Sequence, residues 1–452
     1  MNTVKNKHVA VLGFGIEGKD LVRYLLNHGA KVSIYDTKSE KDLDFSGFDK
    51  SQLTLKCGSD YMSLGLLDFD IIYRSPGLYR YDKAIVEAEN NGVEISSALK
   101  LFMHECPAKV VGVTGTKGKG TTSTLIYRIL KISGKDVYLA GNIGKPYLEL
   151  LPQLKMSSIV VMELSSFQLI DIDKSPQVAV ILNITQDHLD WHKDVKEYVD
   201  AKKNIVKYQN PDDFVIINSD YRTSKDYDKL TKSKVYYFSK KKKVKGTYID
   251  RGNIILNVKK PVLIGKTSAL KLMGEHNWEN VMAAVCTSYV AGSDKKAIEE
   301  VIFSFEGLEH RLEKVRKVKG VAFYNDSFST NSEPTIAAIK SFEEPITLIL
   351  GGSDKGLDYG KLARKLSKSK NVQLIILMGE ISNILDDALG EVNYKGKVLK
   401  LGDTEIKNVV KTAFENTPKG GVVLLSPATA SFDMFKNYKD RGNKFKEAVE
   451  NL

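Results

Sequence analysis

The sequence predicts an α/β protein of three domains, each built on a mostly parallel sheet. Short apolar strands alternate with helical stretches in three successive blocks, and this repeated order indicates parallel sheets covered by helices. A glycine-rich turn lies between a strand and a helix in each of the first two blocks. A chain of 452 residues is also too long for a single core. We place the domains at residues 1–97, 98–306 and 307–452.

The first block carries a turn with Gly13, Gly15 and Gly18 between a strand and a helix, and Asp36 ends the next strand. This arrangement is the fingerprint of a Rossmann-like fold, in which the glycines let the backbone approach a pyrophosphate and the helix amino terminus attracts it. The motif alone leaves three readings open: NAD, another diphosphate such as a UDP-sugar, and plain strand–helix packing. A second turn, at residues 75–77, could add a loop at the same sheet edge.

The second block carries a glycine-rich loop, residues 115–121, between a strand and a helix. Successive backbone N–H groups of such a loop can wrap phosphate oxygens, and Lys119 can reach the β- and γ-phosphates. The strict Walker pattern fails twice, because Val113 replaces its first glycine and Gly120 replaces the hydroxyl residue after the lysine. Thr121 is then the nearest hydroxyl for Mg²⁺. We therefore predict a central, P-loop ATPase-like domain that binds ATP.

Polar side chains follow two further strands of this block. Glu163 ends one strand, and Asn183, Asp187 and His188 follow the other. Ligands of open α/β sheets bind at the carboxyl ends of strands, and carboxylates are ligands that Mg²⁺ prefers. These side chains are therefore candidates for a metal site. The alternatives are a surface position for Glu163 and helix capping by Thr185 or Asp187.

The third block begins near Gly307 and again alternates strands with helices. Its apolar strands are expected at residues 346–350, 372–378 and 422–425. The pattern predicts a Rossmann-like carboxyl-terminal domain.

Three features of the sequence indicate where in the cell the protein is located. No run approaches the roughly 18 apolar residues of a membrane helix. The apolar residues 9–14 are soon followed by charged side chains and by no small-residue cleavage site, which argues against a signal peptide. Cys57, Cys106 and Cys286 are too widely spaced for a disulfide framework or a zinc site. We expect a cytoplasmic protein with no membrane insertion.

The net charge of +11 comes from 67 Lys and Arg against 56 Asp and Glu. Basic proteins can bind nucleic acid, but here the excess is dispersed along the chain. The only dense run is residues 240–245, which we interpret as a solvated hairpin. We therefore expect no nucleic-acid partner.

Ten motifs then occur in the order and spacing of one known family. They are Gly-Thr-x-Gly-Lys at residues 115–119, Gly-Asn-Ile-Gly at 141–144, Glu-Leu-Ser-Ser-Phe-Gln-Leu at 163–169, Asn-x-Thr-x-Asp-His-x-Asp at 183–190, Tyr-x-x-Ala-Lys at 198–202, Gly-x-His-Asn-x-x-Asn at 274–280, Gly-Leu-Glu-His-Arg at 307–311, Asn-Asp-Ser at 325–327, Gly-Gly-x-x-Lys at 351–355 and Ser-Pro-Ala-x-Ala-Ser-Phe-Asp-x-Phe-Lys at 426–436. Over nearly its whole length the chain resembles the Mur ligases, ATP-dependent amide-forming enzymes of peptidoglycan precursor synthesis. The last motif, with Arg441 and Gly442 after it, resembles the members that add D-glutamate.

The resemblance implies a monomer that joins D-glutamate to the L-alanine carboxylate of UDP-N-acetylmuramoyl-L-alanine through an acyl phosphate, using ATP and two Mg²⁺ ions. It implies that the first domain holds UDP rather than NAD, and that the UDP substrate contacts Gly15, Ile16, Asp36, Thr37, Ser75, Gly77, Asn142, Ser165 and Gln168. The implied ATP contacts are Gly115, Thr116, Lys117, Gly118, Lys119, Gly120, Thr121, Asn277, Asn280, Arg311 and Asp326. The implied D-glutamate contacts are Thr330, Lys355, Ser431 and Tyr438. The implied metal ligands are Thr121, Glu163, His188 and Lys202, the last as a carbamate, and the implied catalytic residues are Lys119, His188, Lys202 and Arg311.

Three positions depart from the family pattern. Gly120 replaces a Ser or Thr, Phe328 stands where the family often has a lysine, and Tyr438 is an aromatic variant at the acceptor site. The first departure puts metal affinity in question, and the second implies that one contact to the nucleotide is missing. Another Mur-type ligase with a different amino acid is the main alternative. An NAD-dependent dehydrogenase, a nucleic-acid P-loop ATPase and a folylpolyglutamate-type ligase each explain only part of the chain.

Overall fold

The computed structural model describes residues 4–63, 65–142, 144–185 and 191–452. They form three sheets in two compact units, one of Met1–Leu270 with Glu275–Phe305 and one of Lys271–Gly274 with Glu306–Leu452. The predicted α/β class with mostly parallel sheets is confirmed. The predicted boundaries after residues 97 and 306 stay a prediction.

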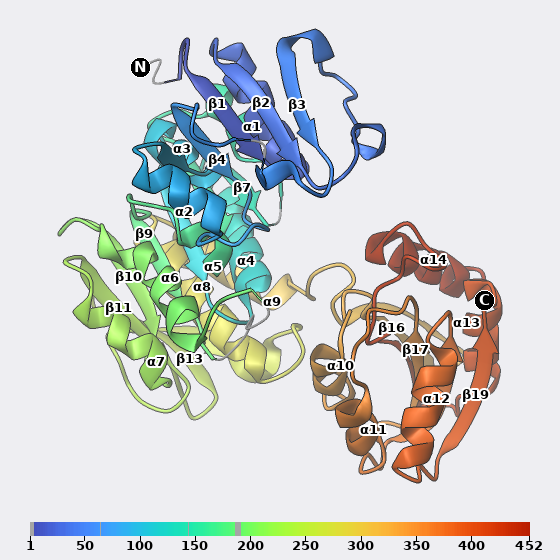
Figure 1. The fold of residues 1–452 in the computed structure, drawn as a ribbon. Coiled ribbons are helices and arrows are strands. Elements are labelled where there is room, and N and C mark those ends of the chain that lie inside the picture. Colours follow the sequence, from blue (N-terminus) through green and yellow to red (C-terminus); the bar gives the residue numbers. More distant parts are fainter. Residues whose placement is uncertain (1–3, 64, 143, 186–190) are drawn as a thin grey trace. The chain divides into compact units, whose positions relative to one another are not determined.

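The first sheet has five strands, all parallel. In spatial order they are β3 (Leu53–Cys57), β2 (Lys31–Asp36), β1 (His8–Leu12), β4 (Ile71–Arg74) and β5 (Glu94–Ser96). Helix α1 (Ile16–Asn27) connects β1 to β2, and α2 (Lys83–Asn90) connects β4 to β5. Because the strands run in one direction, the turns after β1, β2 and β4 meet at one edge of the sheet (Figure 1).

The second sheet, in the same unit, has nine strands. In spatial order they are β14 (Pro261–Lys266), β13 (Asn253–Asn257), β12 (Gly246–Asp250), β11 (Lys234–Ser239), β10 (Phe214–Asn218), β9 (Val178–Ile181), β6 (Lys109–Thr114), β8 (Ile159–Glu163) and β7 (Val137–Gly141). Its helices are α3 (Ala98–Glu105), α4 (Lys119–Ile132), α5 (Ser166–Leu169), α6 (Val195–Lys207), α7 (Arg222–Lys225), α8 (His276–Val290) and α9 (Lys295–Ser304). The phosphate loop follows strand β6, which lies between β9 and β8. The polar residues predicted after these three strands therefore share one edge.

The hairpin predicted at residues 240–245 is wrong. Strands β11 and β12 on either side pair in parallel, through three residues of each strand. The hairpin lies one strand later, between β12 and β13, where Arg251 and Gly252 both have positive φ. Two-residue hairpin turns need that left-handed backbone, and the lysine run contains no glycine to supply it. Lys241, Lys242 and Lys243 are exposed, as expected of a solvated run.

The carboxyl-terminal unit carries a six-stranded sheet. In spatial order its strands are β15 (Glu313–Val318), β16 (Val321–Asn325), β20 (Val422–Leu425), β17 (Ile346–Gly351), β18 (Val372–Met378) and β19 (Lys397–Gly402), and its helices are α10 (Ser332–Ile339), α11 (Gly360–Leu366), α12 (Ser382–Glu391), α13 (Ile406–Glu415) and α14 (Tyr438–Glu450). Only the edge strand β15 is antiparallel to its neighbour. The loops after β16, β20 and β17 therefore lie at one edge. They carry three of the residues predicted to bind the amino acid, and the fourth, Tyr438, begins α14.

No helix within the described ranges is long and apolar enough to cross a membrane. All three cysteines are free, as predicted.

Helix α1 joins the first two sheets through a buried carboxyl group. The Asp20 side chain, only 5% exposed, accepts a hydrogen bond of 2.9 Å from the Leu148 N–H, at the start of a 3₁₀ turn (Leu148–Gln153) of the second sheet's domain. Burial raises the pKa of Asp20 from 3.8 to about 6, although the hydrogen bond opposes this effect. The folded chain therefore keeps a proton on Asp20 between about pH 4 and 6 that the unfolded chain has lost.

We expect Asp20→Asn to be increasingly stabilising as the pH rises from 4 to 6. The wild-type protein loses up to about 3 kcal/mol of unfolding free energy over this range, because a shift of about two pKa units is worth that much. The asparagine carbonyl can still accept the Leu148 N–H but has no charge to bury. Thermal unfolding midpoints of both proteins, measured every half pH unit, check this difference. Parallel midpoint profiles would show that Asp20 ionises freely in the fold.

Candidate functional site

The glycine turn after β1 is held by the carboxylate that ends β2. Asp36 accepts hydrogen bonds from the Phe14 N–H at 2.7 Å and the Lys38 N–H at 2.9 Å. A Cβ on Gly18 would lie 2.0 Å from the Gly13 carbonyl oxygen. Only glycine therefore lets the helix start approach the turn this closely. Ile16 is 80% exposed beside the helix start. The turn thus presents open backbone at a helix amino terminus, as a pyrophosphate site requires.

The turn predicted at residues 75–77 is fastened by a buried arginine, Arg74, which ends β4. Its guanidinium forms an ion pair of 2.5 Å with Asp171 and donates to carbonyl oxygens of the turn, including that of Ser75 at 3.0 Å. The Trp191 indole N–H donates to the Gly77 carbonyl at 3.2 Å. Asp171 and Trp191 belong to the second sheet's domain, so this turn is bound to both sheets of the unit.

The phosphate loop is organised by Thr116. Its N–H donates to the Asn183 carbonyl at 2.8 Å, and its hydroxyl donates to the Thr185 carbonyl at 3.0 Å. These bonds tie the loop after β6 to the segment after β9. Lys119 opens α4, and its ammonium group donates to the carbonyls of Gly115 at 3.0 Å and Thr116 at 3.1 Å. The lysine therefore lies over the loop that the sequence predicted to hold phosphates.

The asparagines predicted to lie near the nucleotide flank this loop. Gly118 has a φ of +87°, and a Cβ there would lie 2.2 Å from Asn280 Oδ1. Asn280 also accepts from the Thr122 hydroxyl at 3.3 Å and donates to Asn277 Oδ1 at 2.8 Å. Both asparagines belong to α8, which packs against α4. The structure thus brings Asn277 and Asn280 to the phosphate loop.

Oxygen atoms suited to a hard cation lie at the same sheet edge. Glu163 ends β8 and is 7% exposed, and its Oε2 has no hydrogen-bond partner among the described residues. Within the same ranges, Asn183 Oδ1 after β9 is also buried without a partner. Thr121, which carries a hydroxyl group, is buried in the first turn of α4. Unpaired buried oxygens are costly, and carboxylate and hydroxyl oxygens are the ligands that Mg²⁺ prefers. The donor set therefore fits this ion.

Lys202 reaches the loop from α6. It is 2% exposed, and its ammonium group lies 3.3 Å from Thr114 Oγ1 and 3.5 Å from the Gly115 carbonyl oxygen. The ring of Tyr198 on the same helix lies 4.7 Å from that nitrogen. Lys202 is therefore a buried residue and not a surface lysine. His188 lies outside the described residues.

Ser165 and Gln168, predicted to contact the sugar–alanine part of the substrate, form a capping box at the start of α5. The Gln168 N–H donates to Ser165 Oγ at 3.3 Å, and Gln168 Oε1 accepts from the Ser165 N–H at 3.0 Å. The Gln168 amide then donates to Glu17 of α1 at 2.6 Å. Sequence reasoning missed Glu17, because an acidic residue in the first turn of a helix is an ordinary pattern.

A second missed group is His192, which connects Ser166 Oγ at 2.9 Å to Glu197 Oε1 at 3.0 Å. The order hydroxyl, imidazole, carboxylate is that of a nucleophilic triad. However, Ser166 is 1% exposed and His192 is 2% exposed, so no substrate carbonyl can reach the hydroxyl. The group instead ties α5 to the first turn of α6, the helix that carries Lys202.

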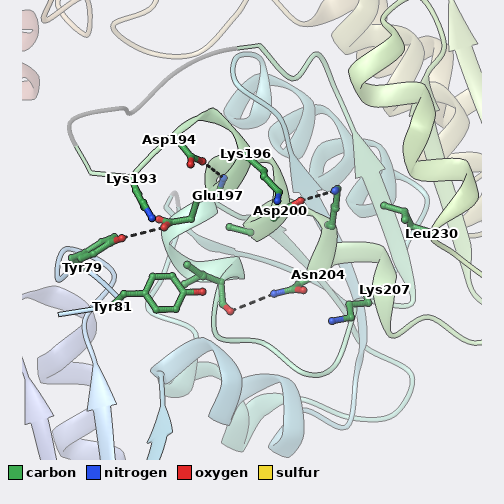
Figure 2. A pocket seen from close by; sticks show the side chains of 13 residues that line it. Tyr79, Tyr81, Lys193, Asp194, Lys196, Glu197, Asp200, Asn204, Lys207 and Leu230 are labelled. Carbon is green, nitrogen blue, oxygen red and sulfur yellow. Dashed lines mark hydrogen bonds and ion pairs between the residues drawn. The ribbon is translucent and has the colours of Figure 1, made fainter. Parts of the chain in front are cut away.

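A separate cavity of about 800 Å³ lies on another side of α6 (Figure 2). Its lining residues are Tyr79, Tyr81, Ile170, Lys193, Asp194, Lys196, Glu197, Asp200, Ala201, Lys203, Asn204, Lys207 and Leu230. Both lysines and carboxylates line it, and Lys203 pairs with Asp200 at 2.5 Å. None of the predicted site residues within the described ranges lines this cavity.

In the carboxyl-terminal unit, the two residues predicted to reach the nucleotide lie close together. Asp326 follows β16 and accepts from Ser426 Oγ at 2.7 Å and the Leu312 N–H at 3.1 Å. Burial raises its pKa to about 6. The Arg311 guanidinium lies 3.8 Å from the centre of the Phe328 ring, a cation–π contact. The Phe328 ring in turn meets Tyr438 edge-on, with ring centres 4.9 Å apart.

The residues predicted to bind the amino acid follow strands of this sheet. Lys355 is exposed after β17, Thr330 is half-buried after β16, and Ser431 is buried after β20. Buried Arg441 ties two of these loops together, because its guanidinium donates to the carbonyls of Ser327 and Ala430, each at 3.0 Å. The unit therefore gathers hydroxyl groups and cations at one sheet edge, as recognition of a small anionic molecule requires.

Comparisons with known proteins show which family the chain resembles along its length. The family model described as Mur ligase middle domain matches residues 113–288, and the one described as Mur ligase MurD-like, N-terminal domain matches residues 7–97. The UDP-N-acetylmuramoylalanine–D-glutamate ligase of Clostridium tetani is 38% identical over 455 residues, covering 99% of this chain and 98% of its own. The ligase of the same name from Acetivibrio thermocellus is 39% identical over 462 residues, covering 99% and 97%.

Two solved structures share the fold. The UDP-N-acetylmuramate–alanine ligase MurC of Thermotoga maritima matches with a TM-score of 0.61 at 18% identity, over 98% of this chain and 99% of its own. The MurF ligase of the same organism, in complex with ADP, matches with a TM-score of 0.55 at 17% identity, over 99% and 96%.

Proposed function

The chain belongs to the Mur ligase family, and on that premise we propose that it joins D-glutamate to UDP-N-acetylmuramoyl-L-alanine with consumption of ATP. The observation that carries this proposal is the 38% identity with D-glutamate ligases over 99% of the chain. In this proposal, residues 1–97 bind UDP, residues 98–306 bind ATP and residues 307–452 bind the amino acid. The enzyme acts as a cytoplasmic monomer, without nucleic acid or membrane insertion.

ATP binds at the loop after β6 in this proposal. The N–H groups of residues 115–121 surround the β- and γ-phosphates, and Lys119 turns from the loop carbonyls toward the γ-phosphate. Asn277 and Asn280 hold the adenine side. Arg311 and Asp326 of the carboxyl-terminal unit contribute to the same nucleotide. The fixed donors cost no reorganisation when charge develops during transfer.

Thr121, Glu163, His188 and Lys202, the last as its carbamate, hold two Mg²⁺ ions. Support comes from the buried, unpartnered oxygen of Glu163 and from the Lys202 nitrogen at the loop. A protonated lysine cannot bind a cation, but its carbamate provides an anionic oxygen. Bound Mg²⁺ supplies charge neutralisation between the carboxylate substrate and the polyphosphate.

The reaction then proceeds in two transfers. An oxygen of the L-alanine carboxylate attacks the γ-phosphorus, the bond to ADP breaks, and an acyl phosphate forms. The deprotonated amine of D-glutamate next attacks the carbonyl carbon, and phosphate leaves as the amide forms. Lys119 and Arg311 stabilise charge on the transferring group, and positioning contributes most of the remainder.

The two substrates occupy the other predicted residues. Gly15, Ile16, Asp36, Thr37, Ser75 and Gly77 hold the UDP part, and Asn142, Ser165 and Gln168 hold the muramoyl-alanine part. Thr330, Lys355, Ser431 and Tyr438 hold D-glutamate. The Arg311 guanidinium and the Tyr438 ring both contact the Phe328 ring, and this supports a shared role for them despite the lost lysine.

Phosphate release from ATP and Mg²⁺ with UDP-N-acetylmuramoyl-L-alanine tests the proposal, with D-glutamate, L-glutamate, glycine, L-alanine and L-lysine as separate acceptors. We expect release only with D-glutamate, together with the matching mass gain of the UDP-sugar. Release with a different acceptor would move the enzyme within the family. No release with any acceptor would contradict the proposal.

A further inference from the structure

Glu17 occupies an unexpected position for its charge. It is the second residue of α1, directly after Gly15 and Ile16, at the helix end that the proposed function assigns to a diphosphate. A carboxylate at this place repels the anion that the helix amino terminus attracts. The side chain must therefore have another task that outweighs this repulsion.

Its contacts lie in the neighbouring domain rather than in its own. Glu17 Oε1 accepts a hydrogen bond of 2.6 Å from the Gln168 amide, 151 positions along the chain. Burial raises the pKa of Glu17 above its ordinary value. The buried Tyr147 hydroxyl also interacts with this carboxylate and opposes the effect of burial on its pKa. The fold tolerates this unfavourable burial to keep a carboxylate against Gln168.

That contact and the Ser165 N–H together fix which way the Gln168 amide faces. Gln168 Oε1 accepts from both the N–H and the hydroxyl of Ser165, at 3.0 and 3.1 Å. The amide nitrogen therefore points to Glu17, whose Oε1 accepts its hydrogen bond. Without an acceptor at residue 17, the amide nitrogen loses this bond, and the Gln168 side chain is held less firmly against Ser165. A flipped amide would set its own NH₂ group against the Ser165 N–H.

We infer that Glu17 is a positioning residue that connects the UDP-binding turn to the Ser165–Gln168 pair. Gln168, itself 1% exposed, is held so that its Oε1 fixes the half-buried Ser165 where the sugar–alanine part of the substrate binds. The inference rests on the proposed function, because that function gives Ser165 and Gln168 their substrate. Glu17 itself does not touch the reacting atoms. It acts by fixing Gln168 at 2.6 Å.

Steady-state kinetics of Glu17→Ala and Glu17→Gln test this role. In Glu17→Ala we expect KM for UDP-N-acetylmuramoyl-L-alanine to rise about tenfold or more, since a hydrogen bond to a charged group is lost. KM for ATP should change less than about twofold. Glu17→Gln keeps an oxygen acceptor for Gln168, so its KM values should stay within about threefold of wild type. The exposed Glu87 of α2 gives a matched control, Glu87→Ala, with no change.

A double-mutant cycle with Gln168→Ala separates positioning from general damage. If Glu17 acts through Gln168, Glu17→Ala adds less than about twofold to KM in the Gln168→Ala background. Independent, multiplying effects would overturn the inference. So would a lowered unfolding midpoint and kcat at unchanged KM, or a Glu17→Gln variant as impaired as Glu17→Ala.

The same variants remain informative if the proposed function fails. A wild-type enzyme that uses no acceptor would contradict the ligase assignment, but it can still bind the UDP-sugar. Calorimetric Kd values for UDP-N-acetylmuramoyl-L-alanine should then show the tenfold weakening in Glu17→Ala, and no such weakening in Glu17→Gln or Glu87→Ala. Equal Kd values in wild type and Glu17→Ala would reject the positioning role directly.

Discussion

Replacing Lys119 with alanine is expected to lower kcat by at least about a hundred- to a thousandfold, because it removes a fixed cation from the position where charge moves during phosphoryl transfer. The fold should persist. The Lys119 ammonium donates to carbonyls of its own loop, those of Gly115 and Thr116. The loop is also held independently by Thr116, through bonds to the segment after β9.

Phosphate release under saturating substrates measures this loss, and the unfolding midpoint reports on the fold. Lys131→Ala is the matched control, since Lys131 is an exposed lysine at the other end of the same helix. Turnover near the wild-type rate in Lys119→Ala would refute the assignment of the phosphate loop. A large drop in midpoint would instead assign the lysine a structural task.

The fold was largely predictable because its signals are local. A glycine turn between an apolar strand and a helix specifies the chain path over about 20 residues, and such units occur in all three sheets. The prediction of a hairpin at residues 240–245 was wrong because the lysine run carries no local signal for a turn. Its direction depends on backbone φ values, and the lysine run offers no glycine, whereas Arg251 and Gly252 adopt positive φ one strand later.

The site was predictable only where residues recur as motifs. Lys119, Glu163 and Lys202 converge at one sheet edge, and each belongs to a motif that the sequence displays. Glu17 and His192 carry no such signal, because each acts through a partner far away in the sequence or buried against another helix. Hydrogen bonds of this kind depend on tertiary structure, which spacing along one chain does not encode.

Phe328 illustrates how a departure can be read only in the structure. The sequence indicates a lost lysine and therefore a missing contact to the nucleotide. The structure adds that the ring supports the Arg311 guanidinium at 3.8 Å and meets Tyr438 at 4.9 Å. An aromatic face can thus hold an arginine that a lysine at residue 328 would repel.

Turnover of the wild-type enzyme is expected to depend on dissolved CO₂, and Lys202→Met is expected to lose activity by about a thousandfold. The Lys202 nitrogen would attack CO₂, release a proton and become a carbamate, whose oxygens can hold a cation as the ammonium cannot. Its buried place, 3.5 Å from the Gly115 carbonyl, gives a surface role no support. Methionine keeps the length of the side chain and its fit in the core but cannot form the adduct.

Activity measured in CO₂-free buffer, and again after bicarbonate is added, checks this dependence. Wild type should lose turnover and regain it, whereas Lys202→Met should respond to neither treatment. Lys203→Met is the control, because the neighbouring lysine pairs with Asp200 on the outer side of α6 and should keep the wild-type response. A ¹³C-carbamate resonance from labelled CO₂ should appear in wild type and vanish in Lys202→Met. Full activity of Lys202→Met, or wild-type turnover indifferent to CO₂, would leave the second cation without this ligand and require another anionic group to take its place.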